Sequence, residues 1–121
     1  MKKRILLADD EKELLSISKR LLERLGYEVA SSFTSARTAW DKLSEGEISL
    51  PDIILTDNDF GESIYNGYWL AVRVKALFPQ IKVVMVSGSK QPDPLPEILD
   101  AFVSKPYGLE NLTETLNELV A

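Results

Sequence analysis

Cysteine and histidine are both absent from the 121 residues of the chain. The absence of cysteine excludes disulfides, thiolate zinc sites and cysteine nucleophiles, and it is consistent with a reducing compartment. The absence of histidine excludes the Ser-His-Asp triad, histidine metal ligands and the usual general base at neutral pH. Acid, base or metal chemistry must therefore come from carboxylates, lysines or hydroxyl groups.

Basic residues are outnumbered by acidic ones, and long apolar runs are absent. There are 14 lysines and arginines against 19 aspartates and glutamates, so the net charge is −5. A protein that binds the phosphate backbone needs a basic stripe, so no direct nucleic-acid partner is expected. The first apolar segment stops at Asp9 and Asp10, far short of a signal peptide or a membrane span. We expect a soluble, cytoplasmic protein with no membrane partner.

The length predicts one domain over residues 1–121, which would bury roughly two-thirds of its unfolded surface. Short apolar segments alternate with segments of helical periodicity. Strands are expected at residues 3–8, 27–32, 53–57, 81–86 and 101–104. Helices are expected from Leu14 to Leu25 with a stop at Gly26, from Thr34 or Ser35 to Gly46, from Leu70 to Phe78, and from Leu109 to Leu119.

This alternation predicts an α/β fold, a doubly wound sheet of five parallel strands in the order 2-1-3-4-5. The fourth helix is expected to be shortened or absent, at most the segment PEILDAF, because three prolines lie between Lys90 and Pro96. The carboxyl ends of parallel strands face one crevice. That crevice would collect Asp9, Asp10, Asp57, Ser87 and Lys105.

The segment PDIILTD, which ends at Asp57, is typical of a central strand buried on both faces. Three carboxylates in one crevice repel, since two unit charges about 4 Å apart cost roughly 4 kcal/mol at an effective dielectric near 20. Either one carboxyl is protonated or a hard cation such as Mg²⁺ binds there. With the ammonium of Lys105 and the hydroxyl of Ser87, these groups suit phosphoryl transfer to a carboxylate nucleophile.

In the order in which they occur, four motifs resemble those of the receiver domain of two-component response regulators. They are the acidic pair Asp9-Asp10, PDIILTD ending in Asp57, Ser87 after the fourth strand, and Lys105-Pro106 after the fifth. The resemblance covers essentially the whole chain. It implies a flavodoxin/CheY-like fold and a phosphorelay signalling module rather than an enzyme, with only self-phosphorylation and self-dephosphorylation.

The resemblance implies that Asp57 accepts a phosphoryl group from a phosphohistidine on a histidine kinase or a histidine phosphotransfer protein. Asp10 and Asp57 would bind Mg²⁺ directly. Asp9 would contact Mg²⁺ largely through water, and the backbone carbonyl of Asp59 would be the remaining ligand that the protein supplies. The Asp59 carboxylate would lie near the path of a hydrolysing water, where it could add negative charge or accept a proton.

Three further roles follow from the same resemblance. Lys105 would pair with the phosphoryl oxygens, and Ser87 would swing in to hydrogen-bond them. Phe102 occupies the aromatic switch position. A movement there would change the surface that an unknown downstream protein binds. The Lys105-Pro106 peptide bond is a candidate cis bond.

Two departures from the family pattern stand out. The loop after Asp57 has Gly61 where the family usually has proline, and about two extra residues before Gly67. The segment from Ser87 to Lys105 is shorter than usual, and it is rich in proline. The usual output surface, to which the fourth helix contributes in typical members of the family, is therefore not expected to carry over to this chain.

Two other functions stay open beside a phosphorylated receiver. A degenerate receiver would bind partners without being phosphorylated, which the altered loop and the reduced fourth helix allow. A phosphatase of the haloacid-dehalogenase type would use the DxD motif of Asp57 and Asp59 as nucleophile and general acid. The acidic pair on the first strand and the short chain argue against that enzyme.

Overall fold

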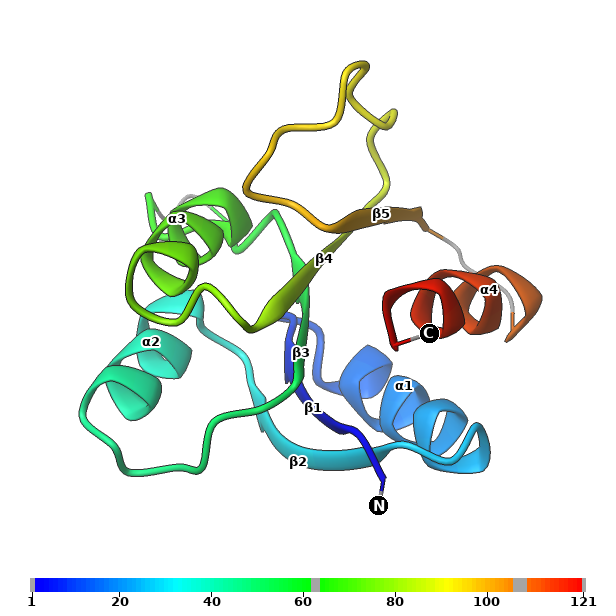
Figure 1. The fold of residues 1–121 in the computed structure, drawn as a ribbon, viewed down its shortest axis with the longest axis horizontal. Coiled ribbons are helices and arrows are strands. Elements are labelled where there is room, and N and C mark those ends of the chain that lie inside the picture. Colours follow the sequence, from blue (N-terminus) through cyan, green and yellow to red (C-terminus); the bar gives the residue numbers. More distant parts are fainter. Residues whose placement is uncertain (1, 62–63, 106–108, 121) are drawn as a thin grey trace.

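Five parallel strands form one sheet in the order β2-β1-β3-β4-β5, which confirms the predicted topology. The computed structural model describes residues 2–61, 64–105 and 109–120. Helices α1 and α4 cover one face of the sheet, and α2 and α3 cover the other (Figure 1). The elements are β1 (Arg4–Ala8), α1 (Lys12–Arg24), β2 (Glu28–Phe33), α2 (Ala36–Ser44), β3 (Ile53–Asp57), α3 (Gly67–Leu77), β4 (Lys82–Ser87), β5 (Ala101–Ser104) and α4 (Leu109–Val120).

Strand β3 lies at the centre of the sheet, and all five of its residues are buried. Successive side chains of a strand point to opposite faces. Ile53 and Leu55 accordingly join the core beneath α1 and α4, while Ile54 joins the core beneath α2 and α3. A strand that is covered on both faces needs a continuous apolar run, which explains why the sequence here is apolar up to Thr56.

The helix ends follow the expected local chemistry. Gly26 follows Leu25, the C-cap of α1, and adopts a φ of 95°, a conformation that favours glycine. Of the two candidate caps of α2, the structure selects Ser35, whose hydroxyl accepts a hydrogen bond from the Thr38 backbone N–H at 3.2 Å. No helix in the described part of the chain is long and apolar enough to cross a bilayer.

The connection between β4 and β5 contains no helix, and all of its residues, 88–100, are described. The prediction of a shortened or absent fourth helix is therefore confirmed. A single turn remains, closed by a hydrogen bond from the Leu99 N–H to the Pro96 carbonyl at 3.0 Å. Leu95, Ile98 and Leu99 of this connection pack against the core beneath α2 and α3.

Asp100 anchors the end of this helix-free connection to the rest of the fold. Its Oδ2 atom accepts a hydrogen bond from the Val83 N–H at 2.7 Å and lies 2.6 Å from the Lys75 ammonium on α3. Lys75 also donates to the Ile81 carbonyl at 2.8 Å. Both charged side chains are about one-fifth exposed, 18% for Lys75 and 20% for Asp100, so water screens their pairing only partly.

We expect Asp100→Ala to lower the free energy of unfolding by about 2 to 4 kcal/mol, because the Val83 N–H loses its acceptor and the Lys75 ammonium loses its carboxylate partner. Glu28→Ala is the matched control. It breaks the Arg4–Glu28 pair, which has a similar length of 2.9 Å but is largely exposed, and should cost less than about 1 kcal/mol. Urea denaturation of both variants measures the difference, and equal losses would contradict this account of Asp100.

Candidate functional site

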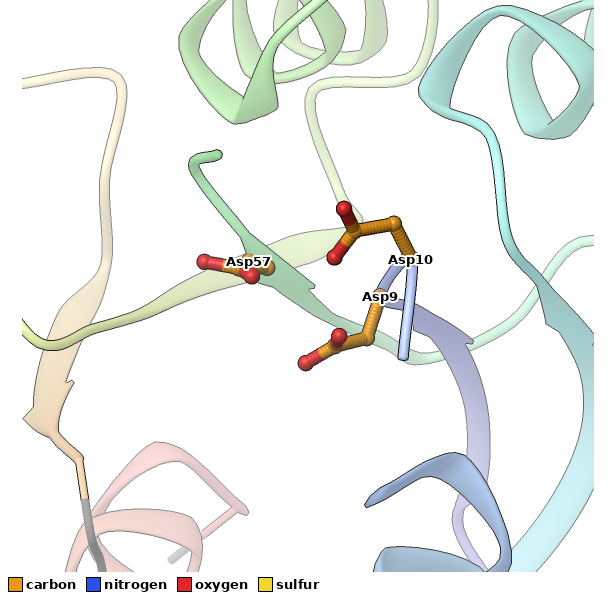
Figure 2. A group of neighbouring side chains, drawn as sticks. All are labelled: Asp9, Asp10 and Asp57. Atoms are coloured by element: carbon orange, nitrogen blue, oxygen red, sulfur yellow. The ribbon is translucent and has the colours of Figure 1, made fainter. Parts of the chain in front are cut away.

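The carboxyl ends of three strands bring charged side chains together. Asp9 and Asp10 follow β1, Asp57 ends β3, and Lys105 follows β5. The parallel register pairs Ala8 with Thr56, so the next residues along the two strands, Asp9 and Asp57, lie side by side. Figure 2 shows the three aspartate side chains gathered at this edge of the sheet.

The three carboxylates are close enough to share one cation. Asp9, Asp10 and Asp57 each offer an oxygen atom, and these atoms all lie within 4.8 Å of one another. Asp9 and Asp57 are buried, each with 7% of its surface exposed, whereas Asp10 is exposed. A donor set made only of oxygen atoms, open to solvent on one side, fits a hard divalent ion that keeps part of its water shell.

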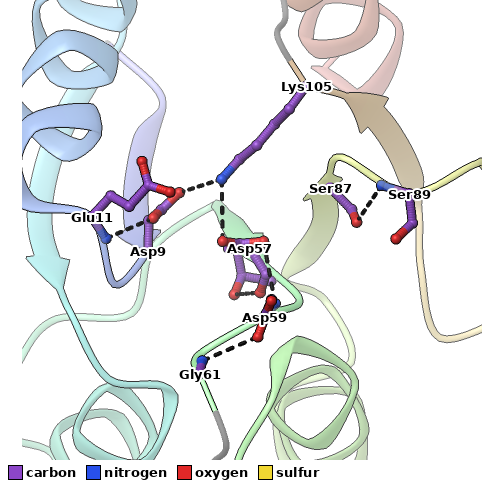
Figure 3. Close-up of polar contacts among 9 residues, drawn as sticks. Asp9, Glu11, Asp57, Asp59, Gly61, Ser87, Ser89 and Lys105 are labelled. Atoms are coloured by element: carbon purple, nitrogen blue, oxygen red, sulfur yellow. Dashed lines mark hydrogen bonds and ion pairs between the residues drawn. The ribbon is translucent and has the colours of Figure 1, made fainter.

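Lys105 bridges two of these carboxylates. Its Nζ atom donates to Asp9 Oδ2 at 2.9 Å and to Asp57 Oδ2 at 3.1 Å (Figure 3). Burial lowers the pKa of the Lys105 ammonium, but the hydrogen bonds and charges of Asp9 and Asp57 outweigh burial and raise the pKa above its ordinary value. Lys105 therefore stays charged at neutral pH.

Backbone N–H groups fix the other oxygen of each bridged carboxylate. The Glu11 N–H donates to Asp9 Oδ1 at 2.9 Å, and the Asp59 N–H donates to Asp57 Oδ1 at 3.2 Å (Figure 3). Each donor lies two residues after its acceptor, so the turn that follows each strand orients the carboxylate. Asp9 and Asp57 thus hold defined orientations.

Asp10 is the carboxylate with the least compensation. Its pKa is raised, first by desolvation and then by the negative charges of Asp9 and Asp57. Among the described residues, no lysine or arginine forms an ion pair with it. The excess negative charge of the crevice therefore lies on its open side, where an incoming cation would meet it.

The remaining candidates lie near this crevice without joining the charge cluster. Ser87 is buried at the end of β4, and its hydroxyl accepts a hydrogen bond from the Ser89 N–H at 3.1 Å. Within the described residues, no hydrogen bond joins that hydroxyl to Asp57 or Lys105. Asp59 is exposed, and its carboxylate accepts from the Gly61 N–H at 3.1 Å.

Phe102 lies on β5, half-buried, and packs against the core beneath α2 and α3. Its switch role, like the roles of Ser87 and Asp59, stays a prediction. The candidate cis bond between Lys105 and Pro106 lies outside the described residues.

Sequence reasoning missed two asparagines beside the site. Asn66 caps α3 by accepting from the Trp69 N–H at 2.9 Å, and an asparagine just before an apolar helix was a usable signal. Asn58 reaches the same helix by accepting from the Tyr68 N–H at 3.2 Å. Ten residues separate these two partners, and no local pattern indicates such a pair.

Comparison with protein families finds a match to the response regulator receiver domain over residues 5–117. Among curated proteins, the chain is 29% identical over 123 residues to the chemotaxis protein CheY of Thermotoga maritima, covering 98% of each chain. It is 28% identical over 124 residues to the response regulator receiver protein CpdR of Brucella abortus, covering 98% of this chain and 97% of CpdR.

Solved structures agree with this result. A CheY-like receiver domain protein from Methanospirillum hungatei superposes with a TM-score of 0.82 at 28% identity, covering 98% of this chain and 93% of that one. A receiver domain protein from Clostridium thermocellum reaches a TM-score of 0.82 at 24% identity, covering 98% and 94%. The second match bears on the fold alone.

The raised pKa of Asp10 gives a prediction about stability and pH. Because the folded protein holds this proton more tightly than the unfolded chain, stability falls as the pH rises through the raised pKa. We expect Asp10→Asn to unfold at a higher temperature than wild type at neutral pH in a chelator. The gain should vanish below the ordinary pKa of 3.8, where the wild-type carboxyl is protonated in both states.

Thermal unfolding across this pH range measures the effect. Asp93→Asn, which removes one negative charge from the exposed connection between β4 and β5, is the control. If Asp10→Asn gains no more than Asp93→Asn at neutral pH, then neither the desolvation of the Asp10 carboxylate nor its repulsion by Asp9 and Asp57 destabilises the fold.

Proposed function

The chain belongs to the response regulator receiver domains, and from that premise we propose that Asp57 accepts a phosphoryl group and thereby switches a protein-protein interaction surface. One observation supports this most directly. Three carboxylates and one ammonium, drawn from the ends of three strands, meet at the buried Asp57 side chain. Receiver domains are signalling domains, and this chain would modify only itself rather than turn over an external substrate.

As the family implies, the phosphodonor would be a phosphohistidine on a histidine kinase or histidine phosphotransfer protein. Such a histidine must belong to a partner, because this chain has none. A bond forms between the phosphorus and an Asp57 carboxylate oxygen while the phosphorus–nitrogen bond breaks. The electron pair of the broken bond stays on the imidazole nitrogen. The ring leaves as neutral imidazole because it carries one proton, either already on its other nitrogen or taken from solvent by the leaving nitrogen. The signal ends when water attacks the phosphorus, the bond from phosphorus to the Asp57 oxygen breaks, and inorganic phosphate and a proton depart.

The side chains already at the site would prepare this transfer. The Asp59 N–H orients the Asp57 carboxylate, and Lys105 supplies positive charge where the phosphoryl oxygens would arrive. Asp9, Asp10, Asp57 and the Asp59 carbonyl would hold Mg²⁺, which when bound offsets the negative charge of the acceptor and of the phosphoryl oxygens.

Phosphorylation would add about 1.5 to 2 negative charges beside Lys105. The ammonium, now shared between Asp9 and Asp57, would turn toward the new oxygens. The Ser87 hydroxyl, now an acceptor for the Ser89 N–H, would exchange that bond for one to the phosphoryl group, and Phe102 would move with it. We place this signalling in the cytoplasm, with a downstream protein as the reader of the altered surface.

One observation favours a second candidate, a degenerate receiver that binds partners without being phosphorylated. The connection between β4 and β5 lacks its helix, so any surface built on that helix is changed. The phosphatase hypothesis finds less support, because the Asp59 carboxylate that it needs as general acid closes a turn with the Gly61 N–H.

The decisive test is chemical phosphorylation. With acetyl phosphate and Mg²⁺, mass spectrometry should show the addition of one phosphoryl group to wild type, and Asp57→Asn should abolish it because the nucleophile is lost. Asp52→Asn, one residue before the other end of β3, should leave it unchanged. Partner binding with no phosphoryl uptake would favour the degenerate receiver, and sustained hydrolysis of many phosphomonoesters would favour the phosphatase.

Metal binding gives an independent test. Mg²⁺ at about 100 times its dissociation constant should raise the free energy of unfolding by roughly 2.7 kcal/mol, because it binds the folded site only. Asp10→Asn should lose most of this gain. Chemical denaturation with and without Mg²⁺ measures both values, and a wild-type stability that Mg²⁺ leaves unchanged would show that these carboxylates hold no metal.

A further inference from the structure

The residue directly after Asp57 is tied to the first turn of α3. The first N–H groups of a helix lack partners within the helix and must find them elsewhere. In α3, the Gly67 N–H donates to the Asn58 carbonyl at 3.1 Å, and the Tyr68 N–H donates to Asn58 Oδ1 at 3.2 Å. Asn66 takes the next N–H, that of Trp69, at 2.9 Å. Asn58 therefore satisfies two of these three donors.

The helix end also lies directly against the backbone of the acceptor. A Cβ atom added at Gly67 would collide with the Asp57 carbonyl oxygen, and it would lie 2.9 Å from both Asn58 Cα and Met85 Sδ. The buried Gly67 thus lets two backbones touch with no side chain between them. With no spare room in this contact, the α3 end cannot move closer to β3 unless the Asp57 backbone also moves.

On its other side, Asn58 belongs to the turn that orients the acceptor. The Asp59 N–H donates to Asp57 Oδ1 at 3.2 Å, so Asn58 is the middle residue of a closed three-residue turn. The Asp57 side chain faces Lys105, while the Asn58 side chain faces α3. The turn therefore has one attachment at the charge cluster and another at the helix.

We infer that Asn58 is a positioning residue for phosphoryl transfer, since it fixes the Asp57–Asp59 turn to the N-terminus of α3. This inference rests on the proposed function of Asp57. When the Asn58 amide oxygen is lost, the Tyr68 N–H loses its acceptor, and the turn loses the side-chain half of its attachment. An acceptor displaced by about 1 Å can react 100-fold more slowly. Even a smaller displacement of the Asp57 carboxylate should therefore measurably slow phosphoryl uptake.

Asn66 offers a matched control, because Asn66→Ala also removes one side-chain hydrogen bond to the first turn of α3 but lies outside the Asp57–Asp59 turn. Both variants should have melting temperatures that lie below that of wild type by similar amounts. With saturating Mg²⁺ and acetyl phosphate, Asn58→Ala should slow the initial phosphoryl uptake by about tenfold or more. Asn66→Ala should stay within about twofold of wild type, because its effect is confined to the helix cap.

Amide hydrogen exchange supplies a readout that does not depend on phosphorylation. Asn58→Ala should speed exchange at Asp59 and Tyr68, whereas Asn66→Ala should speed it at Trp69 and leave Asp59 unchanged. Asn58→Asp keeps an oxygen acceptor and should restore slow exchange at Tyr68. Should Asn58→Ala fail to fold, Asn58→Ser replaces it with the same expectation, because the shorter hydroxyl does not reach Tyr68.

Equal uptake rates for Asn58→Ala and Asn66→Ala would overturn the inference, and so would wild-type exchange at Asp59 in Asn58→Ala. If wild type itself takes up no phosphoryl group, the proposed function fails, and exchange at Asp59 alone decides whether Asn58 fixes this turn.

Discussion

The contact of one ammonium with two buried carboxylates organises the functional end of this molecule. Lys105 lies within hydrogen-bond distance of both Asp9 and Asp57, and it offsets part of a charge cluster that would otherwise repel itself. The balance is incomplete, because Asp10 stays uncompensated on the open side. The site is therefore partly neutralised beside Lys105 and still negatively charged beside Asp10, and this remaining charge attracts a cation.

The sheet explains how such a cluster forms without a dedicated scaffold. Because the strands are parallel, their carboxyl ends all lie at one edge of the sheet. Three of them, β1, β3 and β5, place Asp9 and Asp10, Asp57, and Lys105 at that edge. The helices then hold the turns in place. α3 does so most closely, because its first N–H groups bind Asn58 and its first residue, Gly67, touches the Asp57 backbone. The contacts that satisfy the first N–H groups of α3 thus involve the residue directly after Asp57.

The helix-free connection between β4 and β5 shows how the fold tolerates the loss of a standard element. Leu95, Ile98 and Leu99 still cover part of the core, and Asp100 ties the start of β5 to both Val83 and Lys75. The connection thus still covers the apolar core, but it does not present a helical surface to solvent. Prolines made this outcome predictable, since they cannot continue a helix. The anchor at Asp100 had no local signal, because its partners lie far away in the chain.

The sequence alone determined the strand order, the helix ends near Gly26 and Ser35, and the residues available at the carboxyl edge, because these depend on local periodicity and on the handedness of crossovers. Only the tertiary structure decided which of those residues touch. Lys105 contacts Asp9 across 96 positions of sequence, and Asn58 contacts Tyr68 of α3 across ten. Such contacts depend on strand register and on how the turns fold back, and distances of a few ångströms follow only once the whole sheet has formed.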